Sequence, residues 1–217
     1  MSLYKYAKLI AEEMKAGGID IGDKEAAILS AYLSELKKWN SKYNLIGLKD
    51  DIEIARRLFV SSATFLRLLP QTSPISIVDI GSGAGFPGIP FKILCPELKV
   101  TCIDSNKKKV IFLKHVSRVL PVDISATAGR AEEIKAPGGG YDCAVAHSVG
   151  TIDLLVQLSF PLLRDEGILI MRKGEELEEE LRGINLQSNL YSVEARVGVS
   201  PRGEEPYTLV SIKKCST

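Results

Sequence analysis

The chain has 217 residues, of which 45% are hydrophobic and 25% are charged, and its formal net charge is +1. This balance is typical of one ordinary globular domain, alone or with a small appendage, and it excludes a disordered or strongly basic chain. No stretch approaches the roughly 18 uninterrupted apolar residues of a membrane helix, and the first residues, MSLYKYAKLIAEEMK, carry charges throughout. We therefore expect neither a signal peptide nor a membrane partner, and a cytoplasmic location.

Three helical patterns come first in the chain. Apolar residues recur at helical spacing over 3–18, over 23–45 and over 50–70. Asp23 is the expected N-cap of the second helix. We therefore predict an N-terminal helical unit over residues 1–70. The apolar stripe of its second helix comprises Ile28, Leu29, Tyr32, Leu33, Leu36 and Trp39.

From residue 71 to residue 217, short β-branched runs alternate with helical patterns. This alternation is typical of right-handed βαβ crossovers, so it predicts an α/β domain with a mostly parallel sheet. Residues 190–200 and 205–214, joined by the short loop PRGE, predict a hairpin and an antiparallel last strand. The other predicted strands cover 75–80, 99–104, 122–127, 141–146 and 167–172, and the helices between them cover 88–95, 106–119, 129–135 and 152–163.

A glycine-rich stretch, VDIGSGAGFPGIP (78–90), follows the first predicted strand and precedes a helix. Glycine lets a backbone approach a ligand closely, and ligands bind at the carboxyl ends of such strands. Gly81, Gly83 and Gly85 therefore predict a ligand-binding turn. Dinucleotides and S-adenosylmethionine are the two ligand classes that such a turn serves, and residues 83–88 do match the dinucleotide spacing GxGxxG.

Acidic residues near this turn bear on the choice of ligand. Asp79 precedes the first glycine by two residues, where a carboxylate would repel a pyrophosphate but suits the cations of S-adenosylmethionine. We therefore favour that cofactor, with an NAD-dependent oxidoreductase as the alternative. Asp104 ends the next predicted strand and could bind ribose hydroxyls or cap the following helix. Ala131 and Glu132 could border an adenine pocket or simply begin a helix.

Cysteine and histidine usage gives no sign of a metal site. The four cysteines are widely separated and form no CxxC pair, so we expect reduced thiols. Two histidines offer little material for a histidine-based metal site or for a Ser-His-Asp triad.

Five stretches of the chain carry a family resemblance: WNSKYNL (39–45), DIGSGAGFPGIP (79–90), DSNKKKVIFLKHV (104–116), GRAEE (129–133) and RKG (172–174). They resemble the glucose-inhibited division protein B family of 16S ribosomal RNA methyltransferases. The resemblance implies a Rossmann-like S-adenosylmethionine-dependent methyltransferase fold, with a seven-stranded, mostly parallel sheet, an antiparallel last strand and an N-terminal helical cap. It also implies methylation of N7 of guanine 527 in 16S rRNA, on the small ribosomal subunit or its precursor.

The resemblance also implies roles for single residues. Gly81 and Phe86 match the family's cofactor contacts in the glycine loop, and Ala131 and Glu132 match its contacts after the third strand. Asp104 lies where the family places its ribose-side residue.

The chain departs from the family pattern at four positions. Ile46, Arg57, Val60 and His147 stand where the family usually has threonine, histidine, aspartate and arginine. Arg57, His147 and Lys173 are nevertheless our candidates for positioning the substrate or the carboxylate of the cofactor. The departures leave open which guanine is the target, and they also leave open a non-catalytic module that binds the cofactor or RNA.

The proposed chemistry makes modest demands on side chains. Guanine N7 carries a free lone pair, so catalysis can rest on orientation and needs no base or nucleophile. Tyr43 or Phe86 could stack on a base, although the helical spacing of Tyr43 also suits the core. We expect a monomer that holds RNA through some of its basic residues: Lys37, Lys38, Lys42, Arg56, Arg57, Lys107, Lys108, Lys109, Lys114, Arg118, Arg172 and Lys173.

Overall fold

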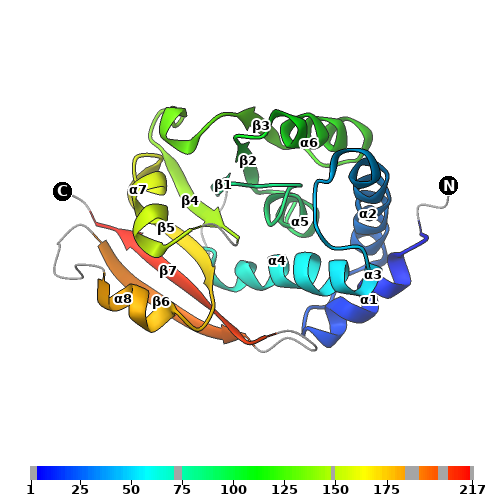
Figure 1. Ribbon diagram of the computed structural model, residues 1–217, viewed down its shortest axis with the longest axis horizontal. Coiled ribbons are helices and arrows are strands. Elements are labelled where there is room, and N and C mark those ends of the chain that lie inside the picture. Colours follow the sequence, from blue (N-terminus) through cyan, green and yellow to red (C-terminus); the bar gives the residue numbers. More distant parts are fainter. Residues whose placement is uncertain (1–3, 71–74, 148–149, 184–190, 200–204, 216–217) are drawn as a thin grey trace.

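A computed structural model describes residues 4–70, 75–147, 150–183, 191–199 and 205–215. Within these ranges, seven strands form one mixed sheet in the order β3-β2-β1-β4-β5-β7-β6 (Figure 1). The strands are β1 (Ser76–Ile80), β2 (Lys99–Asp104), β3 (Ser125–Ala128), β4 (Tyr141–Ala146), β5 (Leu163–Lys173), β6 (Tyr191–Val199) and β7 (Tyr207–Lys214).

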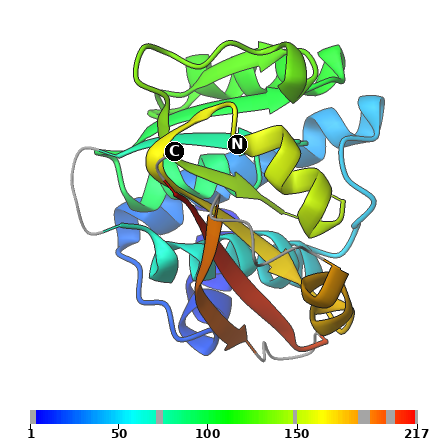
Figure 2. The same cartoon turned by 90° about the vertical axis from the view of Figure 1, so that its left-hand side faces the viewer.

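The sheet confirms the predicted fold class. Strands β1 to β5 pair in parallel, and β7 runs antiparallel between β5 and β6, as Figure 2 shows from the side of the molecule where these strands lie. The predicted strand over 122–127 begins later, and the strand predicted over 167–172 extends from Leu163 to Lys173. The predicted PRGE loop lies outside the described residues.

Two N-terminal helices form where the apolar patterns predict them. They are α1 (Ala7–Ala16) and α2 (Asp23–Tyr43), and the stripe of α2 is buried or partly buried along its length. The predicted cap is wrong by one residue. Gly22 is the N-cap, and Asp23 is instead the first helical residue, where its charge faces the positive end of the helix.

The third helical stretch is irregular. It consists of α3 (Asp51–Ile54), a π-helical segment η1 (Ala55–Val60), α4 (Ser61–Thr64) and a 3₁₀ segment η2 (Phe65–Leu68). Asp50 caps its start, because its Oδ1 accepts hydrogen bonds from the backbone nitrogens of Ile52 and Glu53 at 3.0 and 2.9 Å. The apolar pattern over 50–70 predicts one regular helix here, whereas the structure changes from α- to π- to α- to 3₁₀-helical geometry along the stretch.

The helices of the sheet domain are α5 (Gly88–Leu94), α6 (Lys107–Val119), η3 (Ala131–Glu133), α7 (Ile152–Ser159) and α8 (Leu177–Gly183). Two predicted helices are shorter than expected. The segment predicted over 129–135 forms only a 3₁₀ turn. The helix predicted over 152–163 ends at Ser159, and residue 163 is the first residue of β5.

Two hydrophobic clusters cover the two faces of the sheet. One joins the N-terminal helices to the sheet and to α5 and α6, with Tyr32, Phe59, Ile77 and Phe112 among its members. Figure 1 shows α2, α4 and α5 side by side, and α7 and α8 at the other end of the molecule. The other cluster lies under α7 and α8. The helical unit is therefore packed directly against the part of the sheet that carries the glycine turn.

Two further observations concern possible sites. Cys102 and Cys143 are free and buried, and Cys95 and Cys215 are free and partly exposed. Among the described residues, no cluster of histidine, cysteine or acidic side chains could hold a metal ion, and no helix there is long and apolar enough to cross a membrane.

Candidate functional site

The glycine turn is a tight loop between β1 and α5. Gly81, Gly83 and Gly85 have φ angles of 68°, 60° and 106°, which side chains other than glycine rarely adopt. A Cβ at residue 85 would also lie 2.4 Å from Cδ1 of Ile89. Ser82 anchors the turn, because its Oγ donates to the carbonyl oxygen of Asp79 at 2.9 Å and its backbone nitrogen donates to β2. The turn therefore presents bare backbone at the end of the sheet.

Asp79 lies beneath this turn. Its side chain is fully buried, and its Oδ2 accepts a hydrogen bond from the backbone nitrogen of Gly88 at 2.9 Å. Its Oδ1 is buried without a hydrogen-bond partner in the described structure. Burial, with Asp104 nearby as a smaller cause, raises the pKa of Asp79 to about 7. Asp79 lines neither cavity described below, so the structure places this carboxyl group beneath the turn and not on its ligand-facing side.

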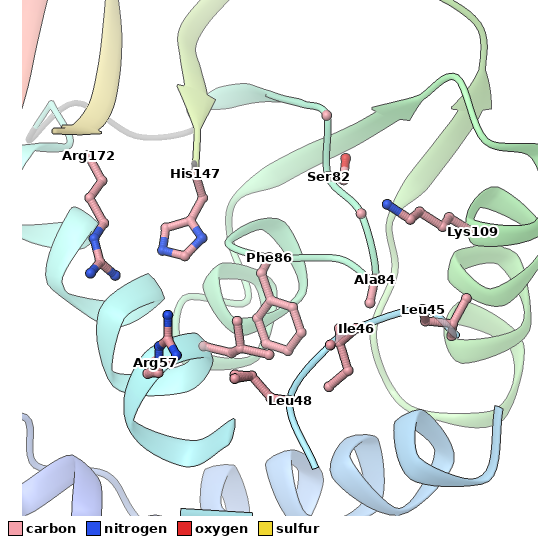
Figure 3. A pocket seen from close by; sticks show the side chains of 14 residues that line it. Leu45, Ile46, Leu48, Arg57, Ser82, Ala84, Phe86, Lys109, His147 and Arg172 are labelled. Carbon is pink, nitrogen blue, oxygen red and sulfur yellow. The ribbon is translucent and has the colours of Figure 1, made fainter. Parts of the chain in front are cut away.

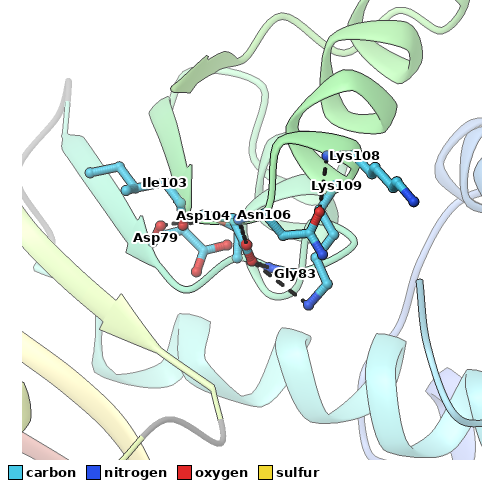
Figure 4. A network of polar contacts seen from close by, with 8 residues as sticks. Asp79, Gly83, Ile103, Asp104, Asn106, Lys108 and Lys109 are labelled. Atoms are coloured by element: carbon cyan, nitrogen blue, oxygen red, sulfur yellow. Dashed lines mark hydrogen bonds and ion pairs between the residues drawn. The ribbon is translucent and has the colours of Figure 1, made fainter. Parts of the chain in front are cut away.

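Asp104 supports the turn from the neighbouring strand (Figure 4). Its Oδ2 accepts from the backbone nitrogen of Gly83 at 2.8 Å, and its Oδ1 accepts from that of Asn106 at 2.7 Å. Lys109 Nζ lies 3.9 Å from Oδ2. Asn106, rather than Asp104, caps α6. Each oxygen of a carboxylate can accept two hydrogen bonds, so Asp104 keeps acceptor capacity for a ligand.

The smaller of two cavities at this edge lies over β1, β2 and the segment after β3. Its volume is about 290 Å³. Asp104, Ala131 and Glu132 line it together with Gly81, so four of the predicted residues do come together here. Apolar side chains complete the wall, among them Ile80, Ile103, Leu154 and Leu158. Such a mixture of apolar surface and few polar groups suits the adenosine part of a cofactor.

The larger cavity lies on the other side of the turn (Figure 3). Its volume is about 540 Å³, and Gly81 borders both cavities. The predicted residues Gly83, Phe86, Arg57 and His147 line it, whereas Gly85 does not. Leu45, Ile46, Leu48 and Leu58 add an apolar wall, and Lys109 and Arg172 add cations.

Phe86 belongs to an aromatic cluster that joins the turn to α2. The ring of Tyr32 lies 5.4 Å from that of Phe86 and 5.7 Å from that of Phe59. The hydroxyl of Tyr32 donates to the carbonyl oxygen of Ala84 at 2.6 Å, inside the protein. Burial raises the pKa of Tyr32 well above its usual value, so the hydroxyl keeps its proton. Tyr43, by contrast, is 45% exposed and lines neither cavity.

The back wall of the larger cavity consists of Arg57, His147 and Arg172, with Ser61 in contact with the last two. His147 directly follows the end of β4. Its Nε2 lies 3.0 Å from Oγ of Ser61, and Nη1 of Arg172 donates to the same oxygen at 2.9 Å. Burial, and then the charge of Arg172, lower the pKa of His147 to about 4, so its ring is neutral at physiological pH. The guanidinium of Arg172 lies over the ring of Tyr207, 3.9 Å from its centroid.

The structure places Lys173 away from the predicted site. Its side chain is only 7% exposed and lines neither cavity. Its Nζ donates to the carbonyl oxygen of Gly150 at 2.7 Å and to both carboxylate oxygens of Glu180, at 3.0 and 2.8 Å. Oε2 of Glu180 also accepts from the backbone nitrogen of Ile152. Lys173 therefore ties β5 to α7 and α8.

Sequence reasoning missed several residues of the larger cavity. Arg172 and Lys109 are predicted only as basic residues that hold RNA, and of the wall over 45–48 the sequence analysis names only Leu45, within a family motif, and Ile46, as a departure from the family. Ser61 contacts the lining residues His147 and Arg172 without lining the cavity itself, and the sequence analysis does not name it. A signal for that wall exists in WNSKYNL (39–45). Asn40 Oδ1 accepts from the backbone nitrogen of Ile46 at 2.8 Å, and Asn44 ends α2 in the left-handed conformation with a φ of 49°.

Comparison with known proteins adds family information to this geometry. The model of the GidB family, described as rRNA small subunit methyltransferase G, matches residues 25–201. A protein of that name from Acetivibrio thermocellus is 36% identical over 179 residues, which cover 81% of this chain and 74% of that protein. Another, from Chloroflexus aggregans, is 35% identical over 213 residues, covering 95% and 89%.

Solved structures share the fold at low identity. TYW2 from M. jannaschii in complex with AdoMet matches with a TM-score of 0.51 and 15% identity, over 66% of this chain and 69% of that one. A ribosomal protein L11 methylase from Lactobacillus delbrueckii matches with a TM-score of 0.55 and 16% identity, over 73% and 79%.

Proposed function

The chain belongs to the GidB family of small-subunit ribosomal RNA methyltransferases, and we therefore propose that it methylates N7 of guanine 527 in 16S rRNA with S-adenosylmethionine as donor. The observation that carries the proposal is the pair of cavities that meet at Gly81. One is suited to an adenosine and the other to a planar base. The family assignment does not support the oxidoreductase alternative.

The residues present fit the cofactor. Asp104 keeps free acceptor positions for ribose hydroxyls, and Ala131 and Glu132 border the same cavity. The bare backbone at Gly81 and Gly83 lets a ligand pass from the smaller cavity into the larger one. When bound, S-adenosylmethionine supplies a methyl group that a lone pair can attack directly, while the electrons of the broken S–C bond stay on sulfur.

The larger cavity would orient the guanine. Phe86 and the apolar wall over 45–48 offer surface for the faces of a base. No side chain has to remove a proton, because N7 is unprotonated, and the proposal asks only for alignment. Arg57 is exposed at the cavity, and no hydrogen bond or ion pair joins it to another described residue, so it is available for a phosphate of the rRNA.

The experiment uses purified full-length protein, methyl-labelled S-adenosylmethionine and small ribosomal subunits that lack this methyl group. We expect label in 16S rRNA, with strand cleavage at the modified guanine mapping to position 527. A folded protein that leaves the rRNA unlabelled would contradict the proposal. Binding of the cofactor without turnover would instead favour the non-catalytic module.

A matched pair of arginine variants tests the role of the cavity. Arg57→Ala and Arg67→Ala each remove one exposed positive charge from the same helical stretch, but only Arg57 lines the cavity. We expect Arg57→Ala to raise KM for the subunit and to lessen its salt dependence, and Arg67→Ala to change neither. Equal effects of the two variants would place the RNA elsewhere. A monomeric enzyme in the cytoplasm completes the proposal.

A further inference from the structure

A chain of hydrogen bonds crosses the back wall of the larger cavity. It runs from Arg172 on β5 through Ser61 on α4 to His147 after β4, with distances of 2.9 and 3.0 Å. These three residues are brought together only by the fold. The ring of Tyr207 lies against the guanidinium and helps to hold it in place (the ring itself is buried).

The direction of these bonds follows from their chemistry. An arginine side chain is always protonated and only donates. Ser61 Oγ therefore accepts from Arg172. Its hydroxyl hydrogen has no acceptor among the described residues other than Nε2 of His147, so the arrangement that satisfies this hydrogen leaves Nε2 bare. The neutral ring then carries its own hydrogen on Nδ1. The low pKa of His147 agrees with a neutral ring.

The protonated nitrogen is directed into the cavity. Figure 3 shows the second ring nitrogen of His147 turned away from Arg172, toward the side where Ser82 and Phe86 lie. Within the described part of the chain, no residue forms a hydrogen bond with Nδ1. His147 thus offers one unused donor to whatever occupies the cavity.

The position of His147 in the sheet indicates which molecule it meets. The smaller cavity lies over β1 and β2, and β4 lies on the opposite side of β1. A cofactor that fills the smaller cavity and passes Gly81 leaves the side next to β4 for the methyl acceptor. The donor of His147 therefore faces the acceptor.

We infer that the Arg172–Ser61–His147 chain makes Nδ1–H of His147 the donor that recognises the O6 carbonyl of the methylated purine. The inference rests on the proposed function, because it takes a purine as the methyl acceptor. Guanine presents an acceptor, O6, next to N7, whereas adenine presents an amino donor there. With adenine, the amino group of the base and Nδ1–H of His147 would both be donors, and no hydrogen bond could form between them. A neutral ring also avoids repelling the positive charge that N7 methylation leaves on the purine.

The tautomer can be measured without turnover. Long-range ¹H–¹⁵N spectra of full-length protein labelled at histidine distinguish protonated from bare ring nitrogens, and His115→Gln assigns the two rings. We expect Nδ1–H for His147 in the wild type and in Ser61→Thr, which keeps the hydroxyl, and a mixture of tautomers in Ser61→Ala. Nε2–H in the wild type would overturn the inference.

Base analogues test the recognition itself. Small subunits are reconstituted with inosine, which keeps O6, or with 2-aminopurine, which lacks it, at the target position. We expect kcat/KM to be roughly 10- to 100-fold lower for 2-aminopurine than for inosine, and the ratio to narrow in Ser61→Ala. Equal rates for the two analogues would overturn the inference alone. Failure to methylate guanine would instead contradict the proposed function, and this inference with it.

Discussion

The two walls of the larger cavity are built in different ways. The turn wall comes from one continuous stretch between β1 and α5, and backbone conformation shapes it. The back wall joins Arg57, Ser61, His147 and Arg172, which lie on three segments far apart in the chain. The turn wall is thus a property of local sequence, whereas the back wall exists only once the sheet and the helical unit have packed together.

Each wall holds one ionisable group whose charged form it disfavours: Asp79, which is fully buried, and His147, which is partly buried. Beneath the turn, burial keeps a proton on Asp79 up to a pKa of about 7. In the back wall, burial and Arg172 keep a proton off the ring of His147 down to a pKa of about 4. Both groups are neutral between about pH 4 and pH 7. His147 becomes positively charged below this range, and Asp79 becomes negatively charged above it. The walls should therefore respond to pH in opposite directions.

The largest expected effect on stability comes from a substitution that disturbs the turn wall and leaves the back wall unchanged. In Gly85→Ala, the Cβ would lie 2.4 Å from Ile89 and 2.9 Å from Leu113, at a φ of 106°. Backbone strain and overpacking together should lower the free energy of unfolding by roughly 5 kcal/mol, measured by urea denaturation. Gly138→Ala is the control, because nothing lies within 4 Å of its Cβ. A stable Gly85→Ala with unchanged cofactor affinity would contradict the turn's dependence on backbone.

The pH dependence sharpens the comparison. The pKa of Asp79 is about 7 when folded, against an ordinary 3.8, so unfolding releases its proton in this range. Its contribution to stability therefore falls as pH rises from about 4 to 7, by up to about 4 kcal/mol. The pKa of His147 is about 4 when folded, against 6.5, so unfolding takes up a proton. Its contribution rises by up to about 3 kcal/mol as pH rises from about 4 to 6.5.

Two variants separate these opposed contributions. Asp79→Asn should leave a stability that increases with pH below about 6.5, and His147→Gln should leave one that decreases up to about pH 7. Differences from the wild type, measured by urea denaturation at each pH, cancel the contributions of the other titrating groups. Curves that stay parallel for all three proteins would show that neither group titrates as its surroundings require.

The difference between the walls explains what the sequence could predict. The glycine turn and Asp104 could be predicted because strand ends and glycine spacing are local signals. The residues alone left Ala131 and Glu132 open between a pocket and a helix start, and the family resemblance supplied their place beside Asp104. For the back wall, the family resemblance supplied Arg57 and His147, but nothing local indicates that Ser61 lies next to His147 or that Arg172 joins them. The sequence analysis favours Lys173, at the end of β5, as a residue that positions the substrate. The side chains of neighbouring residues in a strand, however, point to opposite faces of the sheet. Arg172 therefore faces the cavity, whereas Lys173 faces α8.

A smaller effect tests whether Lys173 is structural. In Glu180→Ala, the ammonium of Lys173 would lose its carboxylate partner while remaining buried, and the backbone N–H of Ile152 would lose its carboxylate acceptor. We expect a loss of about 3 kcal/mol in the free energy of unfolding. The control is Glu179→Ala, an exposed change on the same helix, which should cost little. KM for the ribosomal subunit should stay unchanged in both variants. A rise in this KM in Glu180→Ala alone would instead show that Lys173 contributes to substrate binding.

The smallest expected effect concerns the contact through which the helical unit supports the turn. Tyr32→Phe removes the hydroxyl that donates to the carbonyl oxygen of Ala84, and the aromatic packing around the ring is retained. The carbonyl would be left buried without its donor, so we expect a loss of about 1–3 kcal/mol, measured by urea denaturation. Tyr43→Phe, a change at an exposed residue, is the matched control and should be neutral.

The cofactor affinity of these two variants then tests whether the conformation of the turn wall depends on its contact with α2. Ala84 lines the larger cavity, so a turn that has lost the Tyr32 bond should bind S-adenosylmethionine severalfold more weakly in calorimetry. If Tyr32→Phe is destabilised yet binds as tightly as Tyr43→Phe, α2 stabilises the fold without shaping the turn, and the turn wall is locally determined to its full extent. If affinity falls with stability, the helical unit holds the turn in its binding conformation.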